Sequence, residues 1–334
     1  MEDVKFNSVS VIGGGAWGTA LAQALATGGQ NVTLWAREDS VVEDIETRRV
    51  NRAFLPGVAL DPKIRATSKL SDAARADAIL TVSPAQFVRA TAQSLARDVT
   101  PGTPLVMCAK GIEQATGRLM GEVIAEALPD AVFAVLSGPS FAADVARGLP
   151  AALTLACSNE SVGRGLAEAL SSRQMRLYWS SDVVGAELGG ALKNVMAIAA
   201  GIVDGRGLGA SAHAAVVTRG FAEMRRLSEA MGARPETLLG LSGLGDLVLT
   251  CGSPQSRNMS LGRALGEGKS LASVLGSRTA VTEGVYTAAA VVALARKKHI
   301  EMPIAEAVQA IIEERISVED AITALMKRPL KAED

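Results

Sequence analysis

A lysine inside an apolar stretch is the residue of this sequence with the clearest capacity for acid–base chemistry. Lys193 lies within residues 187–201, which are mostly apolar or small and have helical periodicity. Burial disfavours a charged ammonium, and a second cation nearby, such as Lys110, would add to that effect. The pKa of Lys193 would then fall toward that of a general base. The alternative is a lysine on the solvent-facing side of the helix.

Two polar segments follow apolar runs that we expect to be neighbouring strands. Lys110 comes directly after the run 105–108, and Gly138 and Ser140 come after the run 132–136. Ligands of open α/β sheets bind at the carboxyl ends of the strands, which places these residues beside a ligand. For each of them an ordinary loop or turn role stays open.

Further candidates lie near the middle of the second half of the chain. Asp246 occupies a glycine-rich loop, where it would orient a substrate hydroxyl or the lysine ammonium, or serve as an ordinary turn residue. Ser256 or Asn258 would cap a helix that begins near Met259, which leaves Arg257 beside the positive end of that helix. This combination suits a monophosphate, although Ser-Arg-Asn is also a plain capped helix start.

A glycine turn near the N-terminus predicts a dinucleotide site. Gly13, Gly15 and Gly18 follow a β-branched run that ends at Ile12, and an alanine-rich helix over 16–25 comes next. In the G-x-G-x-x-G fingerprint the glycines provide the tight turn, the close approach to a pyrophosphate, and the packing of helix on strand. The pyrophosphate would rest on the N-terminus of the helix.

The end of the second expected strand, 31–35, decides which dinucleotide is preferred. NAD-selective sites usually have an acidic residue here for the ribose hydroxyls, whereas this chain has Arg37. Its planar fork suits a 2′-phosphate, so we predict NADP as the preferred cofactor. Glu38 and Asp39 follow and keep NAD binding possible, and a solvated Arg37 is the alternative.

The chain divides into a part with alternating strands and helices and a part with helices alone. We expect strands over 8–12, 31–35, 78–82, 105–108, 132–136, 152–157 and 175–179, with helices over 16–25, 86–97, 117–128 and 162–170. This alternation predicts α/β architecture with a doubly wound parallel sheet. From residue 184 we expect only helices, over 184–203, 211–231, 285–298, 304–314 and 318–326. The domains are therefore predicted as 1–181, α/β, and 182–334, all-α, with the ligand between them.

Composition excludes several classes of protein. The net charge of −1 and an aromatic content of 3% argue against nucleic acid as a partner. Lys193, Arg219 and similar charges interrupt the long apolar runs, so we expect no transmembrane segment. The three cysteines match neither a disulfide framework nor a zinc site, and no metal site is expected. We therefore expect a soluble, cytoplasmic protein.

Taken together, these motifs resemble one enzyme family. The chain contains Gly-Gly-Gly-Ala-Trp-Gly at 13–18, Trp-Ala-Arg at 35–37, Lys-Gly at 110–111, Ser-Gly-Pro-Ser at 137–140, Leu-Lys-Asn at 192–194, Gly-Leu-Gly-Asp at 243–246, Ser-Arg-Asn at 256–258 and Thr-Glu-Gly at 282–284. Their order is similar to that in NAD(P)-dependent glycerol-3-phosphate dehydrogenases of the bacterial type. One departure is Ala16, where many members have serine.

This resemblance implies a Rossmann-like N-terminal domain and a C-terminal domain related to that of 6-phosphogluconate dehydrogenase. It implies reversible reduction of dihydroxyacetone phosphate to sn-glycerol 3-phosphate for phospholipid synthesis, with Lys193 as general acid/base. The implied substrate contacts are Lys110, Gly138, Ser140, Lys193, Asp246, Ser256, Arg257 and Asn258. The implied cofactor residues, with those of the glycine turn, are Gly13, Gly15, Ala16, Trp17, Gly18, Arg37, Lys110, Ala142, Arg257, Val281 and Glu283.

Two other functions remain open at this stage. A hydroxyacid dehydrogenase of the same two-domain plan would present a carboxylate to Arg257 in place of a phosphate. A non-catalytic NADP-binding sensor would leave Lys193 and Asp246 without a role. We also expect a homodimer, formed through the helical domain.

Overall fold

A computed structural model describes residues 6–276, 281–329 and 332 of the chain. It contains one eight-stranded sheet with the strand order β3-β2-β1-β4-β5-β6-β7-β8. The strands are β1 (Ser8–Ile12), β2 (Asn31–Trp35), β3 (Ile64–Thr67), β4 (Ala78–Thr81), β5 (Pro104–Met107), β6 (Val132–Ser137), β7 (Ala151–Ala156) and β8 (Met175–Ser180). The order reverses between β1 and β4, which is the point where a doubly wound sheet opens for a ligand.

The sheet departs from the sequence-based prediction in two places. β6 and β7 pair antiparallel, while every other neighbouring pair of the sheet is parallel, so the predicted parallel sheet is confirmed except at this position. The connection over 138–150 contains only a five-residue helix, Ala142–Ala146, and returns the chain antiparallel to β6. The sequence analysis also missed β3, because Ile-Arg-Ala-Thr is too short to show a clear alternation.

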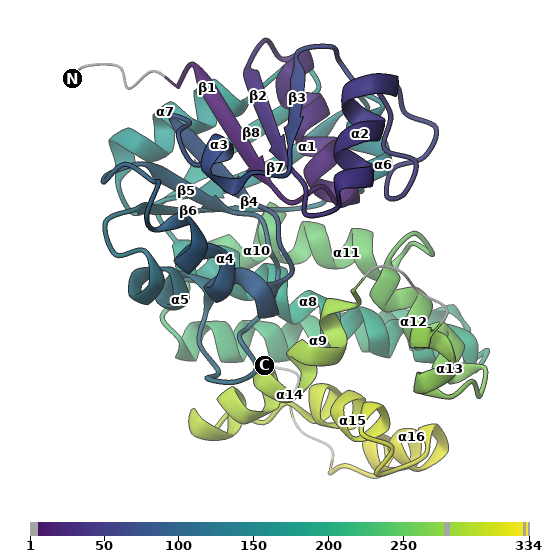
Figure 1. The fold of residues 1–334 in the computed structure, drawn as a ribbon. Coiled ribbons are helices and arrows are strands. Elements are labelled where there is room, and N and C mark those ends of the chain that lie inside the picture. The colour runs from purple at the N-terminus through teal and green to yellow at the C-terminus, as the bar shows by residue number, and fades with distance from the viewer. Residues whose placement is uncertain (1–5, 277–280, 330–331, 333–334) are drawn as a thin grey trace.

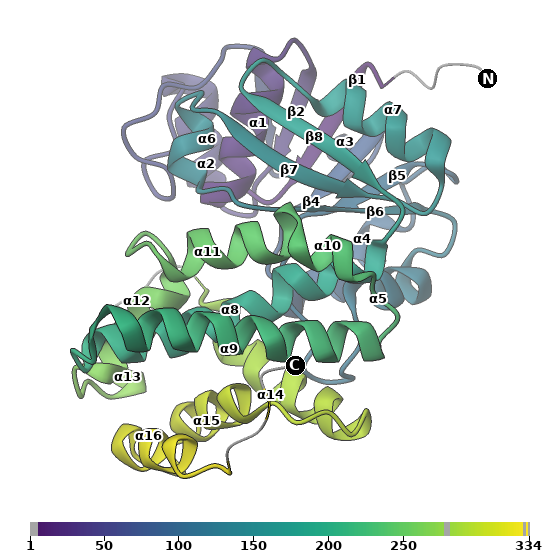
Figure 2. The same cartoon turned by 180° about the vertical axis from the view of Figure 1, so that it is seen from behind.

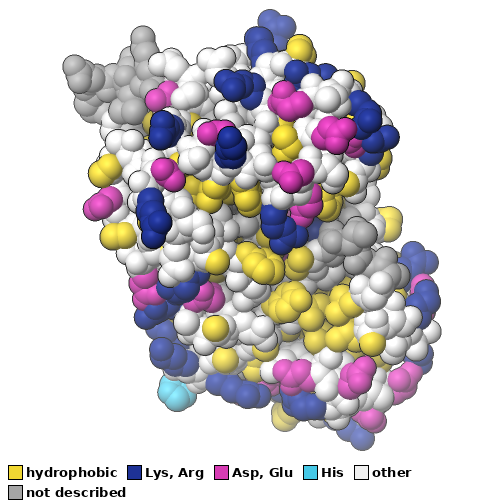
Figure 3. All heavy atoms as spheres, viewed as in Figure 1, with side chains coloured by type: hydrophobic (Ala, Val, Ile, Leu, Met, Phe, Trp, Pro, Cys, Tyr) yellow, Lys and Arg dark blue, Asp and Glu magenta, His cyan; other side chains and the backbone are white. Residues whose placement is uncertain are grey.

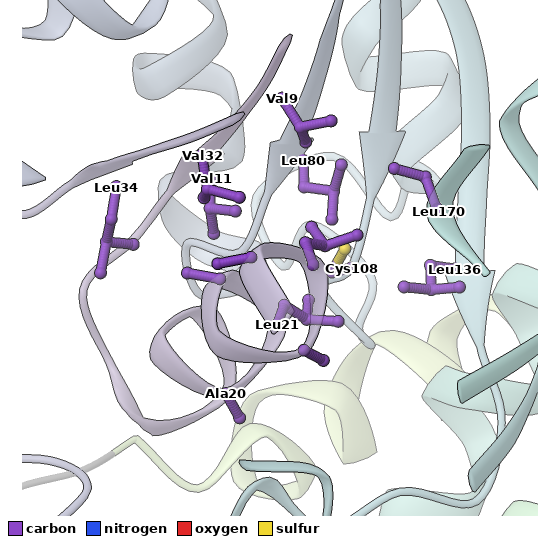
Figure 4. Close-up of a cluster of buried hydrophobic side chains, with 14 of the residues drawn as sticks. Val9, Val11, Ala20, Leu21, Val32, Leu34, Leu80, Cys108, Leu136 and Leu170 are labelled. Atoms are coloured by element: carbon purple, nitrogen blue, oxygen red, sulfur yellow. The ribbon is translucent and has the colours of Figure 1, made fainter. Parts of the chain in front are cut away.

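Helices cover the sheet and enclose its main core. They are α1 (Ala16–Thr27), α2 (Asp39–Arg48), α3 (Leu70–Ala73), the short turn η1 (Ala85–Phe87), α4 (Val88–Leu95), α5 (Met120–Ala127), α6 (Ala142–Ala146) and α7 (Glu160–Leu170). Figure 4 shows α1 nearly end on, with side chains from β1, β2 and β4 gathered around it. This packing holds the N-terminus of α1 against the carboxyl end of β1.

The rest of the described chain is helical, and Figure 1 shows it as a separate layer below the sheet. Its helices are α8 (Val183–Gly205), α9 (Gly209–Ala230), α10 (Pro235–Leu239), the π-helical turn η2 (Leu241–Gly245), α11 (Asp246–Cys251), α12 (Arg257–Gly266), α13 (Leu271–Gly276), α14 (Glu283–Lys297), α15 (Pro303–Ile312) and α16 (Val318–Met326). The five helices predicted after residue 183 lie within two residues of their expected bounds. Those over 235–276 were mostly missed, because glycines interrupt their periodicity.

Helix α8 is the centre of this second part. Its glycines allow α12 to approach closely: a Cβ added at Gly201 would lie 2.0 Å from the carbonyl oxygen of Met259. By length and composition α8 would pass as a membrane span, despite the charge of Lys193, but nearly all of its apolar stretch is buried inside the protein. Its apolar composition therefore matches its position in the core.

The helical part packs against the edge of the sheet at which the parallel strands end, and we call this boundary the seam. Figure 2 shows α10 and α11 between the sheet and the long helices α8 and α9. Figure 3 shows basic and acidic side chains interspersed over the opposite face, with apolar side chains gathered near the seam. Residues that follow strands therefore come to lie against α8 and α11.

Candidate active site

Lys193 lies inside the protein on α8, with its ammonium directed at α11. Its side chain is 9% exposed, so the alternative of a lysine on the solvent-facing side of the helix is wrong. The Nζ atom donates to Oδ1 of Asp246 at 3.0 Å and to Oγ1 of Thr250 at 2.8 Å. A buried ammonium with two fixed acceptors has a defined position, which is what proton transfer to a bound molecule requires.

Asp246 holds two ammonium groups at once. Its Oδ1 accepts from Lys193, and its Oδ2 accepts from Nζ of Lys110 at 2.7 Å. The aspartate is not in an open loop, as we expected, but is the first residue of α11 after the π-helical turn η2. It is 1% exposed, which excludes an ordinary surface turn.

The charges of this cluster determine its protonation. Burial lowers the pKa of Lys193 to about 8, and the Lys110 ammonium contributes to the decrease, while Asp246 opposes it. Burial alone would raise the pKa of Asp246, but the two ammonium groups outweigh it and hold that pKa below its usual range. Near neutral pH the cluster thus contains a carboxylate and a lysine that gains and loses its proton readily.

The residues after β5 and β6 join the same cluster. Nζ of Lys110 also donates to the carbonyl oxygen of Gly138 at 3.0 Å, and Oγ of Ser140 donates to that oxygen at 3.2 Å. Gly138 has φ +144°, a conformation that side-chain-bearing residues rarely adopt. On α8, a Cβ at Gly190 would lie 3.2 Å from Cγ of Lys110, so the missing side chain leaves room for this lysine.

A chain of amide hydrogen bonds connects this cluster to α12 and α14. Nδ2 of Asn194 donates to the carbonyl oxygen of Lys110 at 2.9 Å, and Nδ2 of Asn258 donates to Oδ1 of Asn194 at 2.9 Å. The backbone N–H of Gly284 donates to Oδ1 of Asn258 at 2.9 Å. Every amide in this chain has a fixed orientation, so Asn258 is held beside the lysines.

Arg257, Val281 and Glu283 form a second group beside Asn258. Nη1 of Arg257 donates to the carbonyl oxygen of Val281 at 2.8 Å. Oε1 of Glu283 accepts from the backbone N–H of Ala85, just after β4, at 3.0 Å. Burial lowers the pKa of Arg257 and raises that of Glu283, and the two opposite charges counteract both shifts. An arginine beside the seam suits an anionic ligand.

Ser256 has the capping role that we considered for it. Its Oγ accepts from the backbone N–H of Met259 at 3.2 Å, and α12 begins at Arg257, two residues earlier than we expected. The hydroxyl therefore has a structural partner, and the helix start places Arg257 and Asn258 in its first turn.

The glycine turn has the geometry that the fingerprint predicts. Gly13 has φ +133°, and a Cβ at Gly18 would lie 1.8 Å from the carbonyl oxygen of Gly13. A Cβ at Gly15 would meet nothing within 4 Å, so the turn is open on that side. The N–H groups of Ala16 and Trp17 lie in the first turn of α1, where the helix itself offers them no acceptor.

Arg37 and Ala142 lie apart from the lysine cluster. Arg37 follows β2 beside the glycine turn and pairs with Glu38. Ala142 is the first residue of α6, which packs against α1. Most of the predicted residues thus fall into three groups along the carboxyl edge of the sheet. The lysine cluster contains Lys110, Lys193 and Asp246, the arginine group contains Arg257, Val281 and Glu283, and the glycine turn contains residues 13–18.

Three residues that the sequence analysis did not select belong to this site: Thr250, Asn194 and Gly190. Thr250 lies four residues after Asp246 on α11, and its Oγ1 also donates to Oδ1 of that aspartate at 3.2 Å. An i, i+4 relation to a candidate residue is a signal that sequence reasoning could have used. Asn194 is adjacent to Lys193, but its role depends on contacts between elements.

The cysteines are core residues, as predicted, and His213 pairs with an aspartate of the preceding helix. All three cysteines, Cys108, Cys157 and Cys251, are free and buried. Nδ1 of His213 lies 2.7 Å from Oδ1 of Asp204 on the preceding helix. Within residues 6–276, 281–329 and 332, no group of three or more histidine, cysteine or acidic side chains is arranged to hold a metal ion.

A glycine turn at the switch point of a doubly wound sheet, together with a buried lysine whose pKa is lowered by burial to about 8, defines a dehydrogenase that uses a nicotinamide dinucleotide. The sequence model for the N-terminus of NAD-dependent glycerol-3-phosphate dehydrogenase matches residues 8–163, and that for the C-terminus matches residues 182–323. The chain belongs to this family, and the resemblance inferred from its motifs is confirmed.

Relatives along the whole chain support this assignment. The chain is 59% identical to a glycerol-3-phosphate dehydrogenase [NAD(P)+] of Parvibaculum lavamentivorans, over 99% of both chains. It is 57% identical to the enzyme of the same name from Caulobacter vibrioides, over 99% of this chain and 100% of the relative. The crystal structure of a glycerol-3-phosphate dehydrogenase from Coxiella burnetii matches with a TM-score of 0.92 and 39% identity, over 97% of this chain and 100% of the other.

Proposed function

We propose that this chain reversibly reduces dihydroxyacetone phosphate to sn-glycerol 3-phosphate, with NADPH preferred and NADH as an alternative. The observation that carries the proposal is the Lys193–Asp246–Lys110 cluster at the carboxyl edge of the sheet. Membership of the family and the names of full-length relatives support this reaction. The product suits phospholipid synthesis, which we propose as its use in the cell.

The glycine turn fits a dinucleotide. The close approach of Gly18 to Gly13 and the open space at Gly15 leave room for a pyrophosphate at the N-terminus of α1. We assign the cofactor to Gly13, Gly15, Ala16, Trp17, Gly18, Arg37, Lys110, Ala142, Arg257, Val281 and Glu283. When bound, the nicotinamide ring supplies the hydride that reduces the carbonyl carbon.

Lys193 supplies the proton. As an ammonium it donates a proton to the carbonyl oxygen of the substrate, and as a neutral amine it accepts a proton from the alcohol in the reverse direction. Its pKa of about 8 allows both forms near neutral pH. Asp246 and Thr250 hold Nζ in place, and Lys110 adds positive charge where the oxygen becomes negative.

The remaining polar groups hold the substrate. We assign Lys110, Gly138, Ser140, Asp246, Ser256, Arg257 and Asn258 to substrate binding. Arg257 and the first turn of α12 would bind the phosphate, and Asn258, fixed through Asn194, would orient the neighbouring hydroxyl. Binding energy from the phosphate then serves to orient the reacting carbonyl.

The test is oxidation of NADPH and of NADH in parallel with dihydroxyacetone phosphate as the acceptor. We expect turnover with both cofactors, a higher kcat/KM with NADPH, and a loss of about 10²- to 10⁴-fold in kcat for Lys193→Ala with dinucleotide binding nearly unchanged. Lys269→Ala, at an exposed lysine that pairs with Glu267, is the matched control. Near-normal turnover of Lys193→Ala would refute the assignment.

The two alternative functions make different predictions. D-mandelate dehydrogenase with NADH has a similar fold, with a TM-score of 0.65 at 16% identity, and this similarity shows the fold alone. A hydroxyacid dehydrogenase would turn over a non-phosphorylated acid in preference to the phosphate ester. A cofactor-binding sensor would bind NADPH and turn over neither compound.

We propose further that residues 1–181 and 182–334 are the two domains and that the protein is a cytoplasmic homodimer. The end of β8 at Ser180 and the start of α8 at Val183 support the division. Three free buried cysteines suit a reducing compartment. Sedimentation of the purified protein tests the dimer.

A further inference from the structure

The guanidinium of Arg37 already has an anionic partner. Its Nε donates to Oε1 of Glu38 at 3.2 Å, and its Nη2 donates to the same oxygen at 2.8 Å. The two N–H groups form one edge of the guanidinium fork, which is an edge that a phosphate would also use. Glu38 therefore occupies the hydrogen-bonding position that Arg37 would offer to a 2′-phosphate.

Backbone contacts place this ion pair beside the dinucleotide turn. The N–H of Gly13 donates to the carbonyl oxygen of Trp35 at 3.0 Å, and a Cβ at Gly14 would lie 2.5 Å from Cβ of Ala36. Arg37 is the next residue. The end of β2 thus runs against the glycine turn, and both charged residues lie where the adenine ribose of a bound dinucleotide is held.

The side chain of Glu38 does not cap the helix that follows it. It is the N-cap residue of α2, but its side chain makes no capping hydrogen bond, and its carboxylate turns back to Arg37. The side chains of Arg37 and Glu38 are 78% and 37% exposed, so solvent screens the pair and an incoming anion can displace it.

We propose that Glu38 is a specificity-determining residue, which competes with the 2′-phosphate for Arg37 and accepts the ribose 2′-hydroxyl when that phosphate is absent. This inference rests on the proposed role of Arg37 in the cofactor site. With NADPH, the 2′-phosphate displaces Glu38 from Arg37 and is repelled by its carboxylate. With NADH, the pair stays intact and Glu38 is available to the hydroxyl. The ion pair therefore lowers the ratio of the affinity for NADPH to the affinity for NADH, and NADH remains a usable cofactor.

The direct test is binding of two cofactor fragments, 2′,5′-ADP and 5′-AMP, measured by calorimetry. The fragments differ at the 2′-position, so the ratio of their affinities isolates the 2′-phosphate without any turnover. In Glu38→Gln the affinity for 2′,5′-ADP is expected to rise about two- to fivefold, the range for an exposed ion pair, while that for 5′-AMP stays equal or falls. The ratio of kcat/KM for NADPH to that for NADH should rise by a similar factor.

Asp39→Asn is the matched control, because it removes the same charge one residue further along. It should change the fragment ratio less than Glu38→Gln does. The effect of Glu38→Gln should also shrink in an Arg37→Gln background, since a double-mutant cycle measures the coupling of the pair. An equal effect of Asp39→Asn would mean that net charge alone acts, which overturns the inference.

The remaining outcomes separate this inference from the proposed function. Wild-type protein that binds 2′,5′-ADP, together with an unchanged ratio in Glu38→Gln, refutes the role of Glu38 and leaves the proposed function intact. Wild-type protein that binds neither fragment nor either dinucleotide refutes the cofactor site itself, and the inference with it.

Discussion

The lysine cluster yields a sharp prediction at Asp246, which holds two ammonium groups with one carboxylate. Asp246→Asn keeps the shape and an oxygen acceptor but removes the negative charge that opposes deprotonation of Lys193. The two ammonium groups would then lie together in a buried site without a counter-ion. Lys193 is therefore expected to lose its proton at lower pH than in the wild type.

The size of the effect follows from burial and distance. Nζ of Lys193 lies 3.0 Å from Oδ1 of an aspartate that is 1% exposed, so the pair is poorly screened. Opposite charges in contact attract by several kcal/mol at an effective dielectric constant of about 20, and about 1.4 kcal/mol moves a titration by one pH unit. We expect the pH at which reduction activity falls on the alkaline side to decrease by about one unit or more. Removing one partner of a buried pair should also lower the free energy of unfolding by about 3–5 kcal/mol.

The assay is kcat/KM for dihydroxyacetone phosphate across the neutral and alkaline range. Reduction needs the ammonium form of Lys193, so wild-type activity is expected to fall as pH rises through about 8. Oxidation needs the neutral amine and should rise over the same range. Asp72→Asn, which removes an exposed carboxylate that accepts a hydrogen bond from Thr67, is the control. If folded Asp246→Asn protein loses reduction activity at the same pH as the wild type, the electrostatic coupling between Asp246 and Lys193 is refuted.

Three further predictions concern the elements around the site. Gly18→Ala would place a Cβ 1.8 Å from the carbonyl oxygen of Gly13; we expect at least a tenfold loss of dinucleotide affinity, and unchanged binding would contradict the predicted turn. Thr250→Val removes an acceptor 2.8 Å from Nζ of Lys193, so kcat should fall several-fold and reduction activity should be lost at lower pH than in the wild type. A pH dependence of reduction identical to that of the wild type would contradict this role of Thr250. Burial raises the pKa of Glu223 to about 7, although the backbone N–H groups of Ile304 and Ala305 oppose the shift. The stability from this raised pKa is present below about pH 4.5 and is lost as pH rises through about 7. Glu223→Gln should therefore reduce the change in the free energy of unfolding over this pH range by up to about 3 kcal/mol. An unchanged pH dependence of the free energy of unfolding, measured by denaturant titration, would count against it.

Local sequence patterns were sufficient for most of the elements and for the cofactor turn. Seven of the eight strands were predicted, because β-branched runs bounded by glycine or polar residues carry their own signal. The glycine spacing at 13, 15 and 18 predicted the turn, because each requirement there is steric and involves residues a few positions apart. The apolar surroundings of Lys193 predicted its burial for a similarly local reason.

Other features could be decided only by the folded chain. The reversed direction of β7 and the pairing of the short β3 depend on strands distant in sequence. Lys110 and Asp246 are 136 positions apart, and their 2.7 Å contact exists because the segment after β5 lies beside the first residue of α11 in the tertiary structure. The close approach of Lys110 to Gly190 of α8 is likewise a contact between elements.

The sequence by itself thus determined that the chain has a dinucleotide turn, a sheet of alternating β and α units, and a lysine inside an apolar helix. Only the tertiary structure decided that one carboxylate, that of Asp246, holds both lysines. The physical reason is the range of the interactions involved. Steric limits and periodicity act between near neighbours along the chain, whereas charge coupling depends on distance in space and on burial, which the packing of the elements sets.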